Sequence, residues 1–386
     1  MRVDGFSHKL TLLGKHIFSH LVGSALNRDR FAPVRESLLR ALRNSLFSPG
    51  RHASFNRLLC LRPAALHVDD VLEALEAVSY DDVEQFRRHL IAHVHCEVLA
   101  HGNVGEGEAV AFVKEVRALF PGPGLPAEAI PRERVIGLES GVAYLHRARV
   151  RNPVETNSAV ENYYQVGVDN VRDRAHLLLV EQILGEPCFD VLRTKEQLGY
   201  SVSCGSRWTD GIVGFGICVT SKEAHPDYVA GRVDAFLREF RREVMKPAFA
   251  EDLVEHGAAL ALRRGEKHRS PREVADHAWE GIYDGRPDLF DSHIVEALSC
   301  GRVAPAAVRA MYDRMFGLGA CAPADGATCC AGKLVVRVVG RAATFAEGRG
   351  PDGPPRAPGC RVARGVAAAG LGVCSDAAVV EIGEAL

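Results

Sequence analysis

The segment that decides the fold reads EPCFDVLRTKEQLGY at residues 186–200. Pro187 suits a first helical turn, and the apolar residues after it keep helical spacing. Gly199 supplies a conformation that ends a helix. The sequence therefore predicts a helix that stops near Leu198.

The residues after Gly199 predict a β-hairpin. Tyr200-Ser201-Val202-Ser203 alternates as a strand does, and Thr209-Asp210-Gly211 is typical of a turn. The returning strand carries four apolar side chains on one face, namely Val213, Phe215, Ile217 and Val219. The chain is thus predicted to run from a helix straight into a hairpin.

Arg193 near the helix end and Tyr200 at the strand start are predicted to converge at one rim. A guanidinium and a phenol hydroxyl are both donors suited to a carbonyl oxygen or an oxyanion. The structural alternative is that Arg193 complements the negative end of its helix and Tyr200 is a half-buried packing residue. Spacing alone favours that alternative, because such pairs are common.

Composition disfavours several classes of protein. The chain has 386 residues, 47% hydrophobic and 25% charged, enough for one large or two ordinary cores. No apolar run approaches the roughly 20 residues that cross a bilayer, and a net charge of −2 gives no basic field for nucleic acid. The 11 cysteines follow no disulfide-like spacing, which favours a reducing compartment. We therefore expect a cytoplasmic protein with no nucleic-acid or membrane partner.

An internal echo predicts two related α+β domains. VLEAL at residues 71–75 precedes a helix and the strand-like residues 93–99, and IVEAL at 294–298 precedes a helix and the strand Leu334 to Gly340. A repeat of this length indicates a duplicated domain rather than a solenoid. The first copy lacks its opening strands, so we expect the chain to begin partway through a domain, as a truncated or split gene product.

Four segments are predicted, with an antiparallel-rich sheet packed against helices in each domain. They are the later part of a domain at 1–120, a Pro/Gly-rich linker at 121–130, a complete domain at 131–345 and a flexible Gly/Ala/Pro-rich tail at 346–386. Strands are expected at 142–146 and 162–168, and helices at 6–21, 31–42, 71–78, 83–90, 110–120, 175–184, 229–240, 253–260 and from Ser270. Ser270 should open its helix with a capping box, and Trp279 should anchor that helix in the core.

The sequence lacks the motif of a zinc peptidase of the H-x-x-E-H type. Such an enzyme needs two histidines one helical turn apart and a glutamate that activates the bound water. The nearest string is DLVEH at residues 252–256, which has Asp252 where the first histidine should stand. We interpret it as the solvated face of a helix.

Two other groups could be considered as metal ligands. His93, His95 and Glu97 would share one side of a strand, although an ordinary polar strand face explains them better. Cys321 with Cys329-Cys330 lacks the two-residue spacing of a structural zinc site. We therefore predict that this chain holds no metal.

The sequence resembles the C-terminal half of the pitrilysin/insulinase-type zinc metallopeptidases, in the nardilysin and insulin-degrading-enzyme branch. The block at 186–200 carries the resemblance, and VDGFSHKL at 3–10, HGN at 101–103, YYQ at 163–165 and residues 335–340 match in order. The resemblance implies four homologous α+β domains in two halves that clamp a peptide. This chain would cover the later part of the third domain and the whole fourth.

The resemblance also implies a role for the rim residues. The zinc ligands and the general base would lie in an N-terminal half, in cis or in trans. Arg193 and Tyr200 would reach toward that site, hold the substrate backbone and stabilise the tetrahedral intermediate. Cleavage of peptides by this chain would then require the zinc-bearing half.

Two functions of different class remain open. The first is the substrate-clamping half of a zinc metalloendopeptidase, inactive alone. The second is a non-catalytic peptide-binding or scaffold protein. The presence of both Arg193 and Tyr200 favours the first, because a pure scaffold has no chemical need for the pair.

Overall fold

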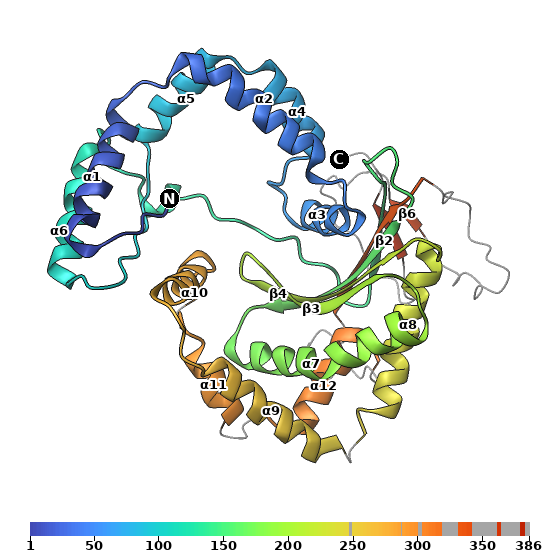
Figure 1. Ribbon diagram of the computed structural model, residues 1–386. Coiled ribbons are helices and arrows are strands. Elements are labelled where there is room, and N and C mark those ends of the chain that lie inside the picture. Colours follow the sequence, from blue (N-terminus) through green and yellow to red (C-terminus); the bar gives the residue numbers. More distant parts are fainter. Residues whose placement is uncertain are drawn as a thin grey trace. The chain divides into compact units, whose positions relative to one another are not determined.

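The computed structural model divides the chain into two compact units (Figure 1). It describes residues 1–246, 249–286, 288–299, 303–318, 331–341, 361–363 and 379–382. Unit 1 comprises residues 1–43, 68–132 and 267–290, and unit 2 comprises residues 44–67, 133–266 and 291–386. The predicted segment limits at 120, 131 and 345 stay predictions.

Helices are the only regular secondary structure among the described residues of unit 1. These are α1 (Ser7–Gly23), α2 (Arg28–Ser45), α4 (Val68–Ala77), α5 (Tyr80–Ala92), α6 (Glu106–Leu119), the short 3₁₀ turn η1 (Ala127–Ala129) and α10 (Pro271–Tyr283). Ser79 caps α5 through a complete capping box with Asp82. The helices expected in this region from apolar spacing are confirmed.

Three expectations for unit 1 need correction. The strand expected at residues 93–99 is wrong, because an extended segment becomes a strand only beside a partner strand, and the described residues provide none there. Trp279 is 41% exposed and does not anchor α10 in a core. The capping box of α10 is half formed, because Ser270 accepts from the Glu273 N–H while the Glu273 carboxylate accepts from Arg269 N–H.

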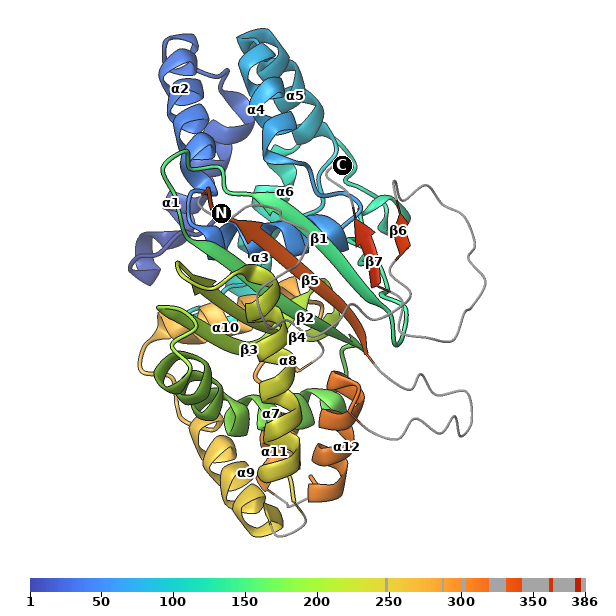
Figure 2. The ribbon, with the colours of Figure 1, turned by 90° about the vertical axis from the view of Figure 1, so that its right-hand side faces the viewer.

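Unit 2 is built on one mixed sheet with the strand order β3-β4-β2-β5-β1-β7-β6 (Figure 2). Its strands are β1 (Ala143–Arg149), β2 (Ser158–Val168), β3 (Ser201–Thr209), β4 (Ile212–Ser221), β5 (Gly332–Val339), β6 (Arg361–Ala363) and β7 (Val379–Ile382). Neighbours from β3 to β5 are antiparallel, and β5-β1, β1-β7 and β7-β6 are parallel. The α+β class and the strands expected around β1, β2 and β5 are confirmed.

Helices cover both faces of this sheet (Figure 1). One face packs against α7 (Val171–Phe189), α8 (Pro226–Glu243) and α12 (Pro305–Phe316), and α9 (Ala250–Arg264) and α11 (Ser292–Ser299) pack against α7 in the same core. The predicted apolar face of the hairpin joins this core, because Phe215, Ile217 and Val219 are fully buried there. Each copy of the echo begins with two helices, α4 and α5 in unit 1 and α11 and α12 in unit 2, and the duplication of a domain stays a prediction.

Helix α3 (Pro49–Leu61) covers the other face of the sheet and was not assigned from the sequence. Its Ala53, Cys60 and Leu61 pack with Tyr163 of β2 and with alternate residues of β5. Because side chains of a strand alternate between faces, β5 contributes to both cores. Helix α3 has little amphipathic pattern, since polar residues are also buried along it.

Two further observations concern membrane spans and the C-terminal tail. Within the described ranges, no helix is both long and apolar enough to span a membrane. Of the tail expected at 346–386, the structure describes only 361–363 and 379–382, where β7 extends the sheet beside β1. The other residues of that tail lie outside the described part of the chain.

Candidate functional site

The helix that carries the 186–200 block is longer than its sequence suggests. Helix α7 runs without a break from Val171 to Phe189, and Pro187 lies inside it rather than in a first turn. The next six residues, Asp190–Lys195, form a wider π-helical turn, η2. Proline has no backbone N–H to donate within a helix, and π-helical turns recur at functional sites. Because α7 begins at Val171, the predicted helix start at Pro187 is wrong. The predicted helix end before Leu198 is confirmed.

The turn from helix to hairpin is made by Gln197 rather than by Gly199. Gln197 has a φ of 53°, in the left-handed region that side chains rarely adopt. Gly199 is required for a different reason, because a Cβ there would lie 2.1 Å from the carbonyl oxygen of Thr220 on β4. The expectation that Gly199 supplies the helix-ending conformation is wrong. Its role is close backbone approach.

Buried apolar residues on both sides fix this turn. Leu192 is fully buried and Leu198 is 4% exposed, and both join the core beneath the sheet. The Leu198 N–H donates to the Leu192 carbonyl at 3.0 Å, and the Glu196 N–H donates to the Val191 carbonyl at 2.9 Å. The local backbone is thus ordered while the polar residues between these anchors face outward.

Arg193 and Tyr200 are placed on the two sides of that turn. Arg193 is exposed, with its guanidinium carbon 4.8 Å from the centre of the Phe189 ring. Tyr200 is 61% exposed and directly precedes β3. Neither side chain hydrogen bonds to the other or to any other residue in the described ranges. Tyr200 is therefore not the half-buried packing residue of the structural alternative, and both donors are available to a ligand.

An ion pair that sequence spacing could not reveal ties this turn to another helix. The Glu196 carboxylate accepts from Arg232 Nε at 2.8 Å and Nη2 at 2.6 Å, and Arg232 lies on α8. The Glu196 carboxylate raises the pKa of the Arg232 guanidinium above its ordinary value. The only signal in the sequence was the charge of each residue, 36 positions apart.

The potential metal ligands do not assemble. His95 Nε2 lies 3.7 Å from Glu97 Oε1, but the described part of the chain contains no group of three His, Cys, Asp or Glu side chains that could hold a metal. Residues 252–256 lie on α9, with Asp252 and Glu255 exposed as expected. Cys321, Cys329 and Cys330 lie outside the described residues. Among the residues that the structure describes, no donor set fits a zinc site.

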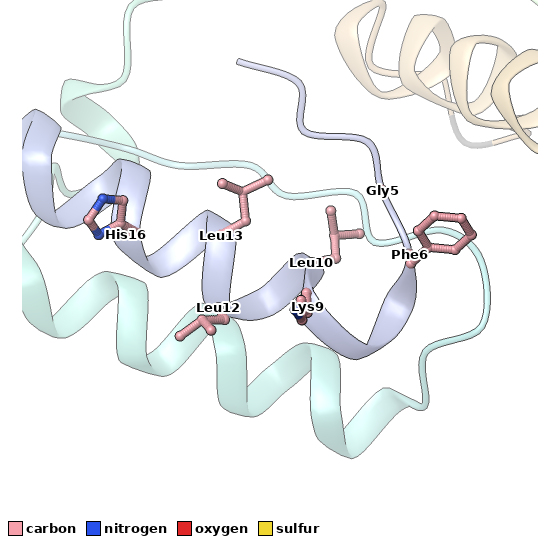
Figure 3. A pocket seen from close by; sticks show the side chains of 7 residues that line it. All are labelled: Gly5, Phe6, Lys9, Leu10, Leu12, Leu13 and His16. Atoms are coloured by element: carbon pink, nitrogen blue, oxygen red, sulfur yellow. The ribbon is translucent and has the colours of Figure 1, made fainter.

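An apolar hollow runs along α1 in unit 1 (Figure 3). Leu10 and Leu13 line it, together with Phe6, which is 84% exposed. Lys9 and His16 are the ionisable residues on its wall. This lining therefore offers mainly apolar contact.

Comparisons of sequence place these features in a family. A model described as the middle or third domain of peptidase M16 matches residues 1–74, and one described as "PQQ synthase PqqF-like, C-terminal lobe domain 4" matches residues 179–279. Nardilysin-like from Arabidopsis thaliana is 31% identical over 319 residues, covering 82% of this chain and 31% of that protein. Insulin-degrading enzyme from Homo sapiens is 32% identical over 288 residues, covering 73% of this chain and 28% of that protein.

Solved structures give the same fold. The crystal structure of pitrilysin aligns with a TM-score of 0.71 at 16% identity, covering 90% of this chain and 36% of that one. A peptidase M16 inactive domain from Pseudomonas fluorescens aligns with a TM-score of 0.59 at 14% identity, covering 89% of this chain and 78% of that one. At these identities the likeness shows the fold alone.

The fold and the two family matches place the chain in the class of metallopeptidases. The chain belongs to the peptidase M16 family, the pitrilysin/insulinase-type peptidases, as the resemblance at residues 186–200 predicts. It spans about three tenths of the length of the nardilysin-like and insulin-degrading-enzyme relatives.

Proposed function

We propose that this chain is the C-terminal, substrate-clamping half of a nardilysin/insulysin-like zinc metalloendopeptidase. It would hydrolyse peptide bonds only together with a zinc-bearing N-terminal half, supplied in cis or in trans. The proposal includes a peptide substrate and a cytoplasmic setting. The observation that carries it is the pair of exposed donors, Arg193 and Tyr200, held on an ordered turn with no hydrogen-bond partner in the described ranges.

The chemistry of the two donors suits peptide hydrolysis. Attack on a peptide carbonyl turns its oxygen into an oxyanion, and donors aimed at that oxygen stabilise the transition state. The Arg193 guanidinium carries a permanent charge and a fork of N–H groups, and the Tyr200 hydroxyl donates one hydrogen bond. In this proposal they hold the substrate backbone and support that oxygen.

This chain's own residues do not fit the zinc of the proposed enzyme. The H-x-x-E-H motif is absent from the whole sequence. The proposal therefore assigns the metal and the activation of water to the other half. The isolated chain is expected to bind no stoichiometric zinc and to cleave no peptide. Metal analysis after dialysis, beside a fluorogenic peptide assay, tests this, and one chelator-sensitive zinc per chain would contradict it.

The decisive experiment fuses or co-expresses this chain with the N-terminal half of an M16 relative. Tyr200→Phe deletes the hydroxyl and keeps the ring, and Arg193→Lys keeps the charge and loses the fork. We expect each to lower kcat by about 10²–10³ if it supports the oxyanion. If the pair only holds substrate in the ground state, KM rises and kcat barely moves.

Matched controls are available on α8 and α10. Arg238 of α8 is exposed and Tyr283 of α10 is 70% exposed, and among the described residues neither has a hydrogen bond or ion pair with the 190–200 turn. Tyr283→Phe and Arg238→Lys should leave kcat and KM unchanged. Wild-type kinetics for both Arg193→Lys and Tyr200→Phe in an active enzyme would contradict the clamping role. That result would favour the alternative, a non-catalytic peptide-binding or scaffold protein.

A further inference from the structure

The turn that presents Arg193 and Tyr200 has an unfavourable backbone. Gln197 adopts a φ of 53°, and residues in such sparsely populated conformations persist only where their surroundings hold them. The π-helical hydrogen bonds of η2 and the close approach of Gly199 to Thr220 add to the constraint. Leu192 and Leu198 anchor its two ends in the core, and a contact with another element can hold the residues between them.

Arg193 and Tyr200 do little to fix themselves. The guanidinium of Arg193 lies over the ring of Phe189, four residues earlier, and Tyr200 is exposed. Where these donors point is therefore set mainly by the backbone between them. Glu196 lies three residues after Arg193 and directly precedes the strained Gln197. Among the polar side chains from 193 to 200 in the described structure, Glu196 alone is tied to another helix.

The other end of that tie is rigid. Arg232 lies on α8, whose Val229, Val233 and Phe236 are buried against the sheet. Asp234, on the same helix, accepts from the Tyr164 hydroxyl at 3.0 Å and from Lys333 Nζ at 2.6 Å, so α8 is also fixed by polar contacts. A two-bond fork between Arg and a carboxylate fixes orientation as well as distance.

We propose that Glu196 and Arg232 form a positioning pair, which holds the 196–199 turn and thereby aims Arg193 and Tyr200 at the substrate. This inference rests on the proposed function. Neither residue touches the peptide, and both act through the backbone of the turn. Breaking the pair lets the turn relax, so the two donors lose their fixed positions.

A second ion pair on α8 is a close internal control. Arg241 donates to Asp313 of α12 through Nε at 2.8 Å and Nη2 at 2.9 Å, the same two-bond geometry. The side chains of Arg241 and Asp313 are 29% and 17% exposed, against 28% and 20% for Arg232 and Glu196. The two pairs should contribute similarly to stability, but only one of them holds the turn.

Hydrogen exchange on the isolated chain tests the pair without any catalytic half. The amides of Glu196 and Leu198 donate within the turn. In the Arg232→Lys and Glu196→Gln variants these two amides should exchange at least tenfold faster than in wild type. In the Arg241→Lys variant their exchange rates should match wild type. Unchanged exchange in both Arg232→Lys and Glu196→Gln would overturn the proposal.

Kinetics of the fused enzyme test the consequence for the site. Arg232→Lys should lower kcat by about tenfold to a hundredfold, because small misplacements of positioning groups cost that much. The double variant Glu196→Gln with Arg232→Lys should be no worse than either single one, and Arg241→Lys should match wild type. Faster exchange with wild-type kcat would overturn the positioning role. Wild-type kinetics for Arg193→Lys and Tyr200→Phe would instead overturn the proposed function, while the exchange result still decides whether the pair holds the turn.

Discussion

Gly199→Ala is the sharpest structural test of the turn. The added Cβ would lie 2.1 Å from the Thr220 carbonyl oxygen and 2.8 Å from its carbon, whereas real Cβ contacts stay beyond 3.0 Å. Both neighbours are backbone, so no flexible side chain can move aside. Thr220 is paired with Ser201 of β3, so the first rung of the hairpin must shift by about an ångström.

The size of the effect follows from that geometry. Overpacking a well-packed site typically costs about 1–3 kcal/mol, and a clash between two backbone segments belongs at the upper end. We expect Gly199→Ala to lower the free energy of unfolding by about 2–3 kcal/mol. With an m-value of about 2–3 kcal/mol per molar urea, the midpoint should fall by about 1 M.

Urea unfolding of the full chain, followed by circular dichroism, measures this shift. Gly185→Ala is the matched control, because Gly185 lies inside α7 and a Cβ there meets nothing within 4 Å. It should raise stability by about 0.5–1 kcal/mol through helix propensity. A Gly199→Ala chain within about 0.5 kcal/mol of wild type would refute the reasoning that close approach requires glycine here.

Two further predictions concern buried ionisable side chains in unit 2. Glu161 is fully buried, and one of its oxygens lies 3.2 Å from Arg57 Nε and 3.5 Å from Arg207 Nε. Glu161→Gln should cost about 3–5 kcal/mol in urea unfolding because it leaves the buried Arg57 guanidinium without its carboxylate partner; a loss no larger than that of the exposed control Glu243→Gln would contradict this. Burial lowers the pKa of the His176 imidazole below its ordinary value of 6.5, so the unfolded chain binds a proton at this ring more readily than the folded chain does. The free energy of unfolding therefore falls as the pH drops below 6.5. His176→Gln should flatten the decline in unfolding free energy between pH 7 and 5, and an unchanged slope would assign it to other groups.

The sequence by itself determined the elements whose information is local. The hairpin follows from alternation and from Asp210-Gly211, which adopt φ values of 45° and 79° as a tight hairpin turn requires. Except for α3, the helices of both units follow from apolar spacing and from caps such as Ser79. The 186–200 block also indicated the family, because its residue types and order are specific.

Only the tertiary structure decided what depends on distant partners. Residues 93–99 have a strand pattern, but pairing needs a neighbouring strand, and none is present beside them among the described residues. Helix α3 is held by the sheet face rather than by its own weak pattern. Gly199 faces Thr220 and Glu196 pairs with Arg232 because the hairpin and α8 fold back onto the turn. These contacts join residues that are neighbours in space and not in sequence, so no local period could specify them.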